Sequence, residues 1–576
     1  MAEQIVKDHA IEALKVAAGW PGADRTTLVT LATVLAATGA DTEGADFFSE
    51  LADRAPGQAL PLALAGFFQV RAGQDVAAGL AKLDQAAEKD LGPPQYYRGL
   101  ALAGLPKEAS KAGQALEDLG FVLAVRDQFP STMIRAAHQG MAAAHAALGN
   151  TEQAAQAAAA SGLAGSPPGA RLEFSGFWVN AADGFHFTSP RIIQPSPGIQ
   201  VAQGYDFCDV AFVTTSDGIV AIDAGTAPRR VAAAVADSGL HASDVSHVIL
   251  THAHFDHAGG IRALLGPGTA VIAQAGFPAE LTRQHANSVG FGYFTGTGAG
   301  FGRGQDPDPP AIAVDQLVSE PTTMTIGGTG IVLYPAVGGE TSDALMAYLP
   351  ASGVLFAGDV LMPYLGAPFF AEGSPDGLIE TLEFIAGLRP RQLVHGHTPL
   401  TELFTMDAVN GLVPALRELR EHALAGISAG KTLAELLEAN LLPEVLREHP
   451  AAVGPYLVTR DHFLQRLHDQ HTGYWQNDGQ GLEPVSPVQR AAALDLLAGG
   501  KPERFAEAAH ALLAQRDHAL ALEIATAGVA RHPGAAELTH LRQQALYRLM
   551  ERHQLQDPFR FLIYAEMAAV EIGPAA

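Results

Sequence analysis

Apolar residues recur at spacings of three and four over residues 1–165, where alanine and leucine dominate and glycine or proline interrupts the pattern. This periodicity predicts paired amphipathic helices. The string LALAG stands at residues 62–66 and again at residues 100–104, which gives a period of 38 residues. A period of this length is typical of helical repeats and close to that of tetratricopeptide units. We therefore expect a helical-repeat domain over residues 1–168, with a surface suited to a protein partner.

The pattern changes at the string SPPG, residues 166–169. Short apolar segments bounded by glycine, proline or aspartate follow, interleaved with helical patterns, and they predict an α/β domain over residues 171–402. The expected strands are residues 176–180, 210–215, 218–223, 247–251, 269–274, 330–335, 345–350, 353–358 and 392–396. Residues 403–576 return to helical periodicity, and a helical pair is expected over residues 517–550 with its turn at 532–534.

Composition narrows the range of partners and compartments. The 576 residues include 36 Lys and Arg against 61 Asp and Glu, a net charge of -25, which disfavours nucleic acid and anionic lipid and leaves a small molecule as the expected partner. The single cysteine, Cys208, cannot form an internal disulfide and is expected to be a small buried residue in a reducing compartment. No signal peptide and no apolar stretch of about 18 to 20 residues is apparent, so a cytoplasmic protein without a membrane span is expected.

The densest chemistry lies in the string THAHFDHAGG, residues 251–260, directly after an expected buried strand. In extended backbone the spacing of two would place His252, His254 and Asp256 on one face and His257 on the other. The two glycines that follow would allow a tight turn into a helix. Imidazole and carboxylate without thiolate suit zinc or a neighbouring divalent metal in an open site. A solvated polar loop is the alternative, which the crowding of histidines disfavours.

The pattern HxHxDH followed by two glycines resembles the signature of the metallo-β-lactamase superfamily. The resemblance implies an αββα sandwich, here flanked by N-terminal and C-terminal all-α, tetratricopeptide-like domains. It also implies further site residues downstream and upstream of the turn. Asp223 in VAIDAGT resembles the aspartate that orients a ligand histidine, and Asp359 in LFAGD resembles the aspartate that bridges two metals. His397 in VHGHTP fits the last ligand, with His395 as a neighbour or alternative.

Three features are similar to the alkylsulfatase branch of that superfamily. Glu340 in GGETSD stands where most members carry a histidine, residues 279–298 are similar to an insert of that branch, and residues 473–500 are similar to its dimerisation domain. The resemblance implies a homodimer formed through residues 403–576. Two departures concern the substrate: the second carboxylate is an ordinary aspartate, and the segment after Asp359 carries no arginine for a sulfate group.

On this resemblance two metal ions per chain are expected, most simply zinc. His252, His254 and Glu340 are assigned to one ion, Asp256, His257 and His397 to the other, and Asp359 to both. The four residues of the histidine turn are also the expected catalytic residues, with a hydroxide between the metals as nucleophile. Because Glu340 adds an oxygen donor and a negative charge, manganese or iron would also be accepted.

Substrate contacts are expected outside the histidine turn. Tyr293 and Arg303 lie in a glycine-rich stretch that would form a flap, and Tyr364 lies with Phe207 and Met362 in segments that would wall an apolar channel or simply pack in the core. The leading hypothesis is a metal-dependent hydrolase of sulfate esters. The alternatives are a lactonase or thioesterase of the same fold, and, in a different class, a helical-repeat scaffold with a structural metal centre.

Overall fold

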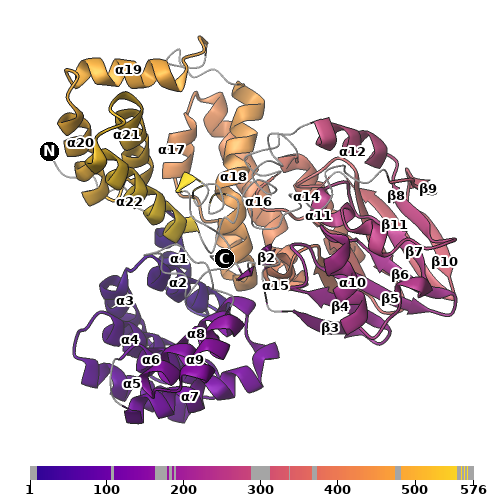
Figure 1. Ribbon diagram of the computed structural model, residues 1–576, viewed down its shortest axis with the longest axis horizontal. Helices are drawn as coiled ribbons and strands as arrows, with labels where there is room; N and C mark the ends of the chain where they lie inside the picture. Colours follow the sequence, from indigo (N-terminus) through magenta and orange to yellow (C-terminus); the bar gives the residue numbers. More distant parts are fainter. Residues whose placement is uncertain are drawn as a thin grey trace.

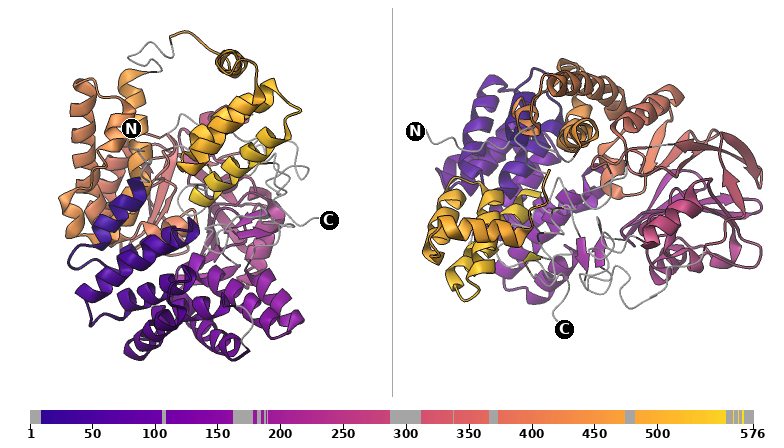
Figure 2. Two further views of the ribbon diagram at one scale, coloured as in Figure 1. Left: turned by 90° about the vertical axis from the view of Figure 1, so that its left-hand side faces the viewer. Right: turned by 90° about the horizontal axis from the view of Figure 1, so that it is seen from above.

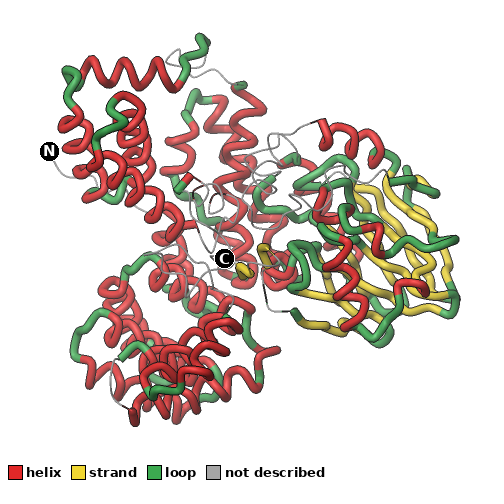
Figure 3. Tube along the Cα trace, in the orientation of Figure 1, coloured by secondary structure: helices red, strands yellow, loops and turns green. Residues whose placement is uncertain are grey.

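The computed structural model describes the helical and sheet regions of the chain with short gaps. The described residues are 9–105, 109–161, 178–180, 184–186, 188, 190–286, 312–336, 338–365, 373–473, 482–553, 560, 564, 567 and 568. Helices come first along the chain, two packed β-sheets follow, and helices return after the sheets (Figure 1). The tube coloured by secondary structure shows the two sheets at one end of the molecule with helices beside them, and helices without strands at the other end (Figure 3).

The N-terminal region consists of antiparallel helices that pack against their neighbours in sequence. They are α1 (His9–Ala18), α2 (Arg25–Ala37), α3 (Asp41–Arg54), α4 (Ala59–Arg71), α5 (Val76–Lys89), α6 (Pro93–Ala103), α7 (Ala109–Ala124), α8 (Ser131–Ala147) and α9 (Thr151–Ala160). The two LALAG strings lie in α4 and α6, which pack side by side, so the repeated string marks corresponding helices of successive pairs. The helical periodicity of this region is thereby confirmed.

The central region is built on two sheets and a small hairpin. The hairpin pairs β1 (Trp178–Asn180) with β2 (Gly184–His186). One sheet has the order β3-β4-β5-β6-β7-β8-β9, with β3 (Arg191–Ser196), β4 (Ile199–Gln203), β5 (Val210–Thr215), β6 (Gly218–Ile222), β7 (Val245–Ile249), β8 (Ala270–Gln274) and β9 (Gln316–Val318). The other has the order β10-β11-β12-β13-β14, with β10 (Thr322–Ile326), β11 (Thr329–Ala336), β12 (Ala344–Leu349), β13 (Val354–Gly358) and β14 (Gln392–His395).

Side chains on β6 and β13 show how the sheets are layered. Val220 and Ile222 join Phe356 in one core cluster between the sheets, whereas Ala221 lies in a second cluster with helix α10 (Pro228–Asp237). On β13, Leu355 faces helix α14 (Pro375–Leu388) instead. Each strand therefore buries both of its faces, which explains why these segments are apolar throughout. The order helix, sheet, sheet, helix confirms the expected αββα sandwich between helical regions.

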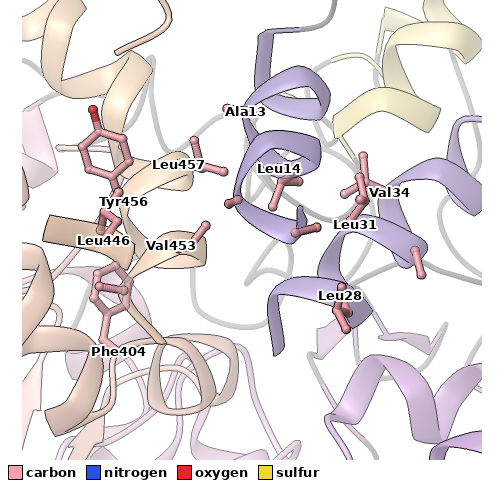
Figure 4. Close-up of a cluster of buried hydrophobic side chains, with 14 of the residues drawn as sticks. Ala13, Leu14, Leu28, Leu31, Val34, Phe404, Leu446, Val453, Tyr456 and Leu457 are labelled. Atoms are coloured by element: carbon pink, nitrogen blue, oxygen red, sulfur yellow. The ribbon is translucent and has the colours of Figure 1, made fainter. Parts of the chain in front are cut away.

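The C-terminal region is helical and shares a core with the N-terminal helices. It contains α15 (Thr398–Leu403), α16 (Met406–Ser428), α17 (Leu433–Glu438), α18 (Val453–Thr472), α19 (Pro487–Leu497), α20 (Pro502–Ala514), α21 (His518–Arg531) and α22 (Ala536–His553). The expected helical pair with a turn at residues 532–534 is present as α21 and α22. Leu14 and Leu31 from α1 and α2 belong to the same buried cluster as Val453 and Leu457 from α18 (Figure 4).

Viewed from above, the N-terminal and C-terminal helices lie together on one side, with the sheets on the other (Figure 2). Helices α16 and α18 stand between the two groups and contact α14, so the sandwich is backed by the helical regions. Among the helices that the structure describes, none combines the length and the hydropathy needed to cross a lipid bilayer.

Candidate metal centre

The candidate site lies where strands from both sheets end. Strands β6 and β7 are parallel neighbours in one sheet, and β13 and β14 are parallel neighbours in the other. Asp223 follows β6, the histidine turn follows β7, Asp359 follows β13, and His397 follows β14. Parallel strands deliver the residues after their carboxyl ends to one edge. Segments separated by more than a hundred residues therefore meet at the edge of the sandwich.

The histidine turn has a different backbone from the one expected for an extended chain. His254 has extended backbone, but a short helix α11 (Phe255–Ala258) starts at the next residue. The side chain of Asp256 therefore lies with His257 and not with His252 and His254. The expectation that the spacing of two would place Asp256 on the face of the first two histidines is wrong. The cause is the helical turn, which replaces alternation by a rotation of about 100° per residue.

The two glycines after this turn are required for close packing rather than for an unusual backbone angle. A Cβ on Gly259 would lie 2.5 Å from the carbonyl oxygens of Phe255 and Thr226. A Cβ on Gly260 would overlap the carbonyl oxygen of Ala224. The residues after β6 and the histidine turn thus approach each other backbone to backbone, and a short 3₁₀ helix rather than an α-helix follows at Ile261–Ala263.

One group of donors consists of His252, His254 and Glu340. The Glu340 Oε2 atom lies 3.3 Å from His252 Nε2 and 3.5 Å from His254 Nδ1. All three residues are buried, with no more than 6% of the surface of each exposed. The arrangement brings the glutamate, from the segment between β11 and β12, to the two histidines that follow β7.

A second group of donors consists of Asp256, His257 and His397, and Asp359 lies between the two groups. Asp256 Oδ2 is 3.4 Å from the Nε2 atoms of both histidines. Asp359 Oδ2 is 2.9 Å from His397 Nε2 and 3.3 Å from His257 Nε2. Asp359 also forms a donor group with His252 and His257, so its carboxylate is within reach of both sets of ligands.

Several donor atoms in this space have no hydrogen-bond partner among the described residues. They are His252 Nε2, His257 Nε2, Glu340 Oε2 and Asp359 Oδ1. A buried polar atom left without a partner is costly, and natural proteins rarely tolerate several of them together. Nitrogen and oxygen donors that converge in this way, without a thiolate, are suited to two divalent cations. The residues present therefore fit the metal pair that the sequence suggests.

Opposite charges shift the pKa values of these groups in the metal-free protein. Burial by itself would raise the pKa of Asp256, but the charges of His257 and His397 outweigh it and lower this pKa to about 2. Burial would lower the pKa of His397, but Asp359 and Asp256 outweigh it and raise this pKa to about 9. The carboxylates thus stay ionised and hold protons on the imidazoles, and a metal ion would have to displace those protons.

Two of the histidines are oriented by hydrogen bonds on the ring nitrogen that faces away from the cluster. His257 Nδ1 lies 2.9 Å from Asp223 Oδ2, and Asp223 also accepts hydrogen bonds from the backbone N–H and the hydroxyl of Thr251. His397 Nδ1 lies 2.9 Å from the carbonyl oxygen of Phe207. In each case a proton on Nδ1 leaves Nε2 directed at the carboxylates.

The loop that carries Phe207 depends on a buried ion pair that the sequence did not indicate. Asp206 Oδ1 accepts hydrogen bonds from the Phe207 N–H and from Arg230 Nη1, both at 2.8 Å. Its Oδ2 accepts one from Thr226 N at 2.8 Å. An aspartate followed by an aromatic residue is common, and its partner Arg230 stands far along the chain in α10, so no local signal marked this pair.

Asp209 is a second residue that the sequence did not indicate. Its carboxylate accepts hydrogen bonds from Thr398 Oγ1 at 3.0 Å and from Gln203 Nε2 at 3.2 Å, and its backbone N–H donates to Gly396 O at 2.6 Å. Asp209 therefore supports the turn that carries His397. Burial raises the pKa of this carboxyl to about 7, against the lowering effects of His397 and its hydrogen-bond donors.

The remaining residues named from the sequence lie in different places. His395 Nε2 lies 3.1 Å from the carbonyl oxygen of Phe404, burial lowers its pKa to about 4, and it belongs to none of the donor groups in the described part of the chain. Cys208 is buried, as expected, with its Sγ 3.6 Å from His257 Nδ1. Tyr364 is half-buried and contacts the His462 ring. Tyr293 and Arg303 lie outside the described residues.

Two parts of the chain match known protein families. Residues 204–397 match the metallo-beta-lactamase superfamily, and residues 432–567 match the family described as alkyl sulfatase dimerisation. The chain carries a metallo-beta-lactamase domain. This domain contains every residue of the two donor groups, and the second match begins in the loop before α17 and covers the helices from α17 through α22.

Relatives of the chain include two curated proteins. The chain is 23% identical over 189 residues to a linear primary-alkylsulfatase from Pseudomonas sp., a match that covers 32% of this chain and 36% of that protein. It is 26% identical over 168 residues to a hydroxyacylglutathione hydrolase from Rhodobacter capsulatus, covering 29% and 54%. The chain thus spans about a third to a half of the length of these relatives.

A similar solved structure extends beyond the metallo-beta-lactamase domain. A stereoselective inverting sec-alkylsulfatase from Pseudomonas sp. superposes with a TM-score of 0.56 at 17% sequence identity. The match covers 67% of this chain and 66% of that one. At this identity the likeness establishes the shared fold.

Gly396 offers a direct test of how tightly the cluster is packed. A Cβ at this position would overlap both Asp359 Oδ1 and His257 Cε1. We expect Gly396→Ala to push these donors apart and to weaken zinc binding by about 10- to 100-fold. The matched control is Gly387→Ala on α14, where a Cβ meets nothing within 4 Å. Zinc titration of metal-free protein against a chromophoric chelator measures the effect, and equal affinities in the two variants would contradict the proposed donor groups.

Asp209 predicts a pH dependence of stability. Its pKa of about 7 lies above the unfolded value, so the protonated carboxyl stabilises the fold at low pH and this contribution is lost between about pH 4 and pH 7. We expect Asp209→Asn, which keeps a neutral hydrogen-bonding group, to be more stable than the wild type at pH 8 by roughly 2 to 4 kcal/mol and equal to it near pH 4. Urea unfolding of metal-free protein across this range checks it, with exposed Asp53→Asn as control. Parallel pH profiles would rule out the buried carboxyl as the cause.

Proposed function

We propose that this protein is a dinuclear metal-dependent hydrolase that acts on sulfate esters. The observation that carries the proposal is the convergence of the two donor groups with Asp359 between them, buried and with unsatisfied donor atoms. His252, His254 and Glu340 would hold one ion, and Asp256, His257 and His397 the other. Zinc suits this set, and the three carboxylates would also accept manganese or iron.

The chain's own residues would bind and orient the reacting groups. When bound, a pair of divalent cations polarises an ester oxygen and lowers the pKa of a water molecule. Asp223 and the carbonyl oxygen of Phe207 keep protons on the Nδ1 atoms of His257 and His397, so the Nε2 lone pairs face the cluster. The burial of all donors excludes bulk water and strengthens each charge interaction at the site.

Three observations support a sulfate ester as the substrate class. The curated relative from Pseudomonas is a linear primary-alkylsulfatase, and the similar fold is that of a sec-alkylsulfatase. The second match adds a region described as alkyl sulfatase dimerisation, so the likeness covers the C-terminal helices as well as the metallo-beta-lactamase domain.

Carboxylic esters and thioesters are the second candidate substrates. The observation that favours them is the likeness to hydroxyacylglutathione hydrolase, together with the ordinary aspartate at Asp359. A scaffold with a structural metal centre is the third hypothesis. It is disfavoured because structural zinc sites are closed and usually rich in cysteine, whereas the donor groups proposed here contain imidazole and carboxylate alone.

A substrate panel distinguishes these functions. We expect zinc-loaded protein to release sulfate from medium-chain primary alkyl sulfates faster than it opens acyl lactones or cleaves thioesters. Asp256→Asn should lower kcat/KM by at least about 10- to 100-fold, because it weakens a metal donor at the reacting centre. The exposed Asp244→Asn is the control.

The other outcomes of this substrate panel would support one of the other two functions. Metal-dependent turnover of lactone or thioester without sulfate release would transfer the proposal to the second class. No turnover, combined with an Asp256→Asn variant that loses its fold, would favour the structural metal centre.

We propose that the C-terminal helices bind a second copy of the chain and so form a homodimer. Helix α19 lies at the outer edge of these helices (Figure 1). The helix and the residues just before it expose large apolar side chains. Leu496 is 84% exposed, Leu497 87% and Val488 71%, and Leu482 and Val485 just before the helix are each 57% exposed. An apolar patch of this kind marks a contact site. It lies within the region matched to alkyl sulfatase dimerisation, which supports a second copy as the partner.

The patch predicts a change of oligomeric state. Because each leucine contributes about 1.5 to 3 kcal/mol when buried, we expect the double variant Leu496→Ser, Leu497→Ser to raise the dimer dissociation constant at least 100-fold. Light scattering on a size-exclusion column over a range of concentrations measures it. Leu265→Ser, 44% exposed in the metallo-beta-lactamase domain, is the control. A wild-type monomer, or a double variant as dimeric as the control, would refute this interface.

A further inference from the structure

Helix α18 of the C-terminal region touches the segment that follows Asp359. The ring of His462 packs edge-on against the ring of Tyr364, with 5.3 Å between centroids. Arg466 Nη2 donates a hydrogen bond to the carbonyl oxygen of Gly373 at 3.1 Å. Residues four apart lie on the same face of a helix, so α18 presents both side chains to the metallo-beta-lactamase domain together. One helix face thus holds two points of the chain between β13 and α14.

Gly373 lies directly against the residue that precedes Glu340. Its backbone has φ of +73°, and a Cβ there would overlap the carbonyl oxygen of Gly339. Gly339 in turn donates its N–H to the carbonyl oxygen of Val360 at 2.9 Å. Because Val360 follows Asp359 in the chain, Arg466 is linked through Gly373 and Gly339 to the backbone beside both carboxylates.

The backbone segments in this contact region are packed too closely to move independently. A Cβ on Gly338 would lie 2.9 Å from Val360 Cα, and one on Gly339 would lie 3.1 Å from Met362 O. Backbone packed against backbone in this way transmits a shift of one segment to the next, because a close-packed interior has little free volume. A displacement of Gly373 would therefore move Gly339 and Glu340.

The two carboxylates require such support. Glu340 and Asp359 are both buried and negatively charged, and like charges repel strongly where water is excluded. Their separation decides whether both can reach the same pair of cations. The surrounding histidines compensate these charges, and the backbone that carries the two carboxylates sets how far apart their side chains can stand.

We propose that His462 and Arg466 are positioning residues of the metal centre, holding Tyr364 and Gly373 so that Glu340 and Asp359 stand at the spacing that binds the metal pair. The proposal rests on the metal-binding part of the proposed function. It makes the helical region a structural part of the site in addition to a dimerisation unit. Both residues would act on the donor groups through the backbone of the segment that they hold.

We call the hold of His462 and Arg466 on Tyr364 and Gly373 the clamp. Metal binding tests this clamp without any need for a substrate. Metal-free Arg466→Met, which removes the donor and keeps the chain length, is titrated with zinc against a chromophoric chelator. We expect the affinity for zinc to fall about 10- to 100-fold. Arg466→Lys, which retains one donor for the carbonyl oxygen, should recover part of the loss. Arg504→Met on α20 is the control, since that arginine is 65% exposed and pairs with Glu507 on its own helix.

A spectroscopic measurement separates positioning from general stability. Cobalt(II) bound in place of zinc reports ligand geometry through its visible absorption bands, and we expect these bands to change in Arg466→Met and in His462→Ala but not in Arg504→Met. If Arg466→Met fails to fold, His462→Ala and Arg466→Lys provide the same comparison. Wild-type zinc affinity and an unchanged cobalt spectrum in the folded variants would overturn the clamp. Normal metal binding by the wild type without ester hydrolysis would instead refute the proposed function and leave the clamp standing.

Discussion

Mutual compensation of buried charge is the interaction on which the site depends. Glu340, Asp256 and Asp359 lie with four histidines in a space that is almost closed to solvent. Carboxylates buried alone would be strongly destabilising, and imidazoles buried alone would lose their protons. Together they stabilise each other, as the low pKa of Asp256 and the high pKa of His397 show. The same arrangement is what two divalent cations require, so stability and metal binding depend on one geometry.

That geometry is supported from several directions. Asp223 and Phe207 orient two of the histidines from the seven-stranded sheet and its first loops, and the Asp206–Arg230 pair holds Phe207 in place. Asp209 and Thr398 support the turn before His397. The outer helices add a further layer, because α18 contacts the segment after Asp359 and shares its core with α1 and α2. The helical regions are therefore joined to the sandwich rather than merely appended to it.

Much of the fold was predictable because strands buried on both faces are apolar throughout. Strands β5 to β8 and β12 to β14 were recognised from such runs, and β1 and β11 from short apolar segments bounded by glycine, proline or asparagine. Strands β2, β3, β4, β9 and β10 were missed. Strand β2 has three residues, and each of the other four carries exposed or half-exposed polar positions that weaken the signal. Asp256 was placed on the wrong face because the start of a four-residue helix leaves no periodicity to read.

The sequence by itself determined the kinds of donor atoms, their order along the chain and an α/β domain between helical regions, because those depend on residue type and on local apolar pattern. The metallo-beta-lactamase fold that would bring the donors together was implied by the resemblance of the histidine motif to that superfamily. Only the tertiary structure decided why Gly259, Gly260 and Gly373 cannot carry a side chain, how Asp206 and Asp209 support the site, and that Arg466 contacts the segment after Asp359. These contacts join residues that are distant in the chain. No local pattern encodes them, because they arise from the packing of whole elements against one another.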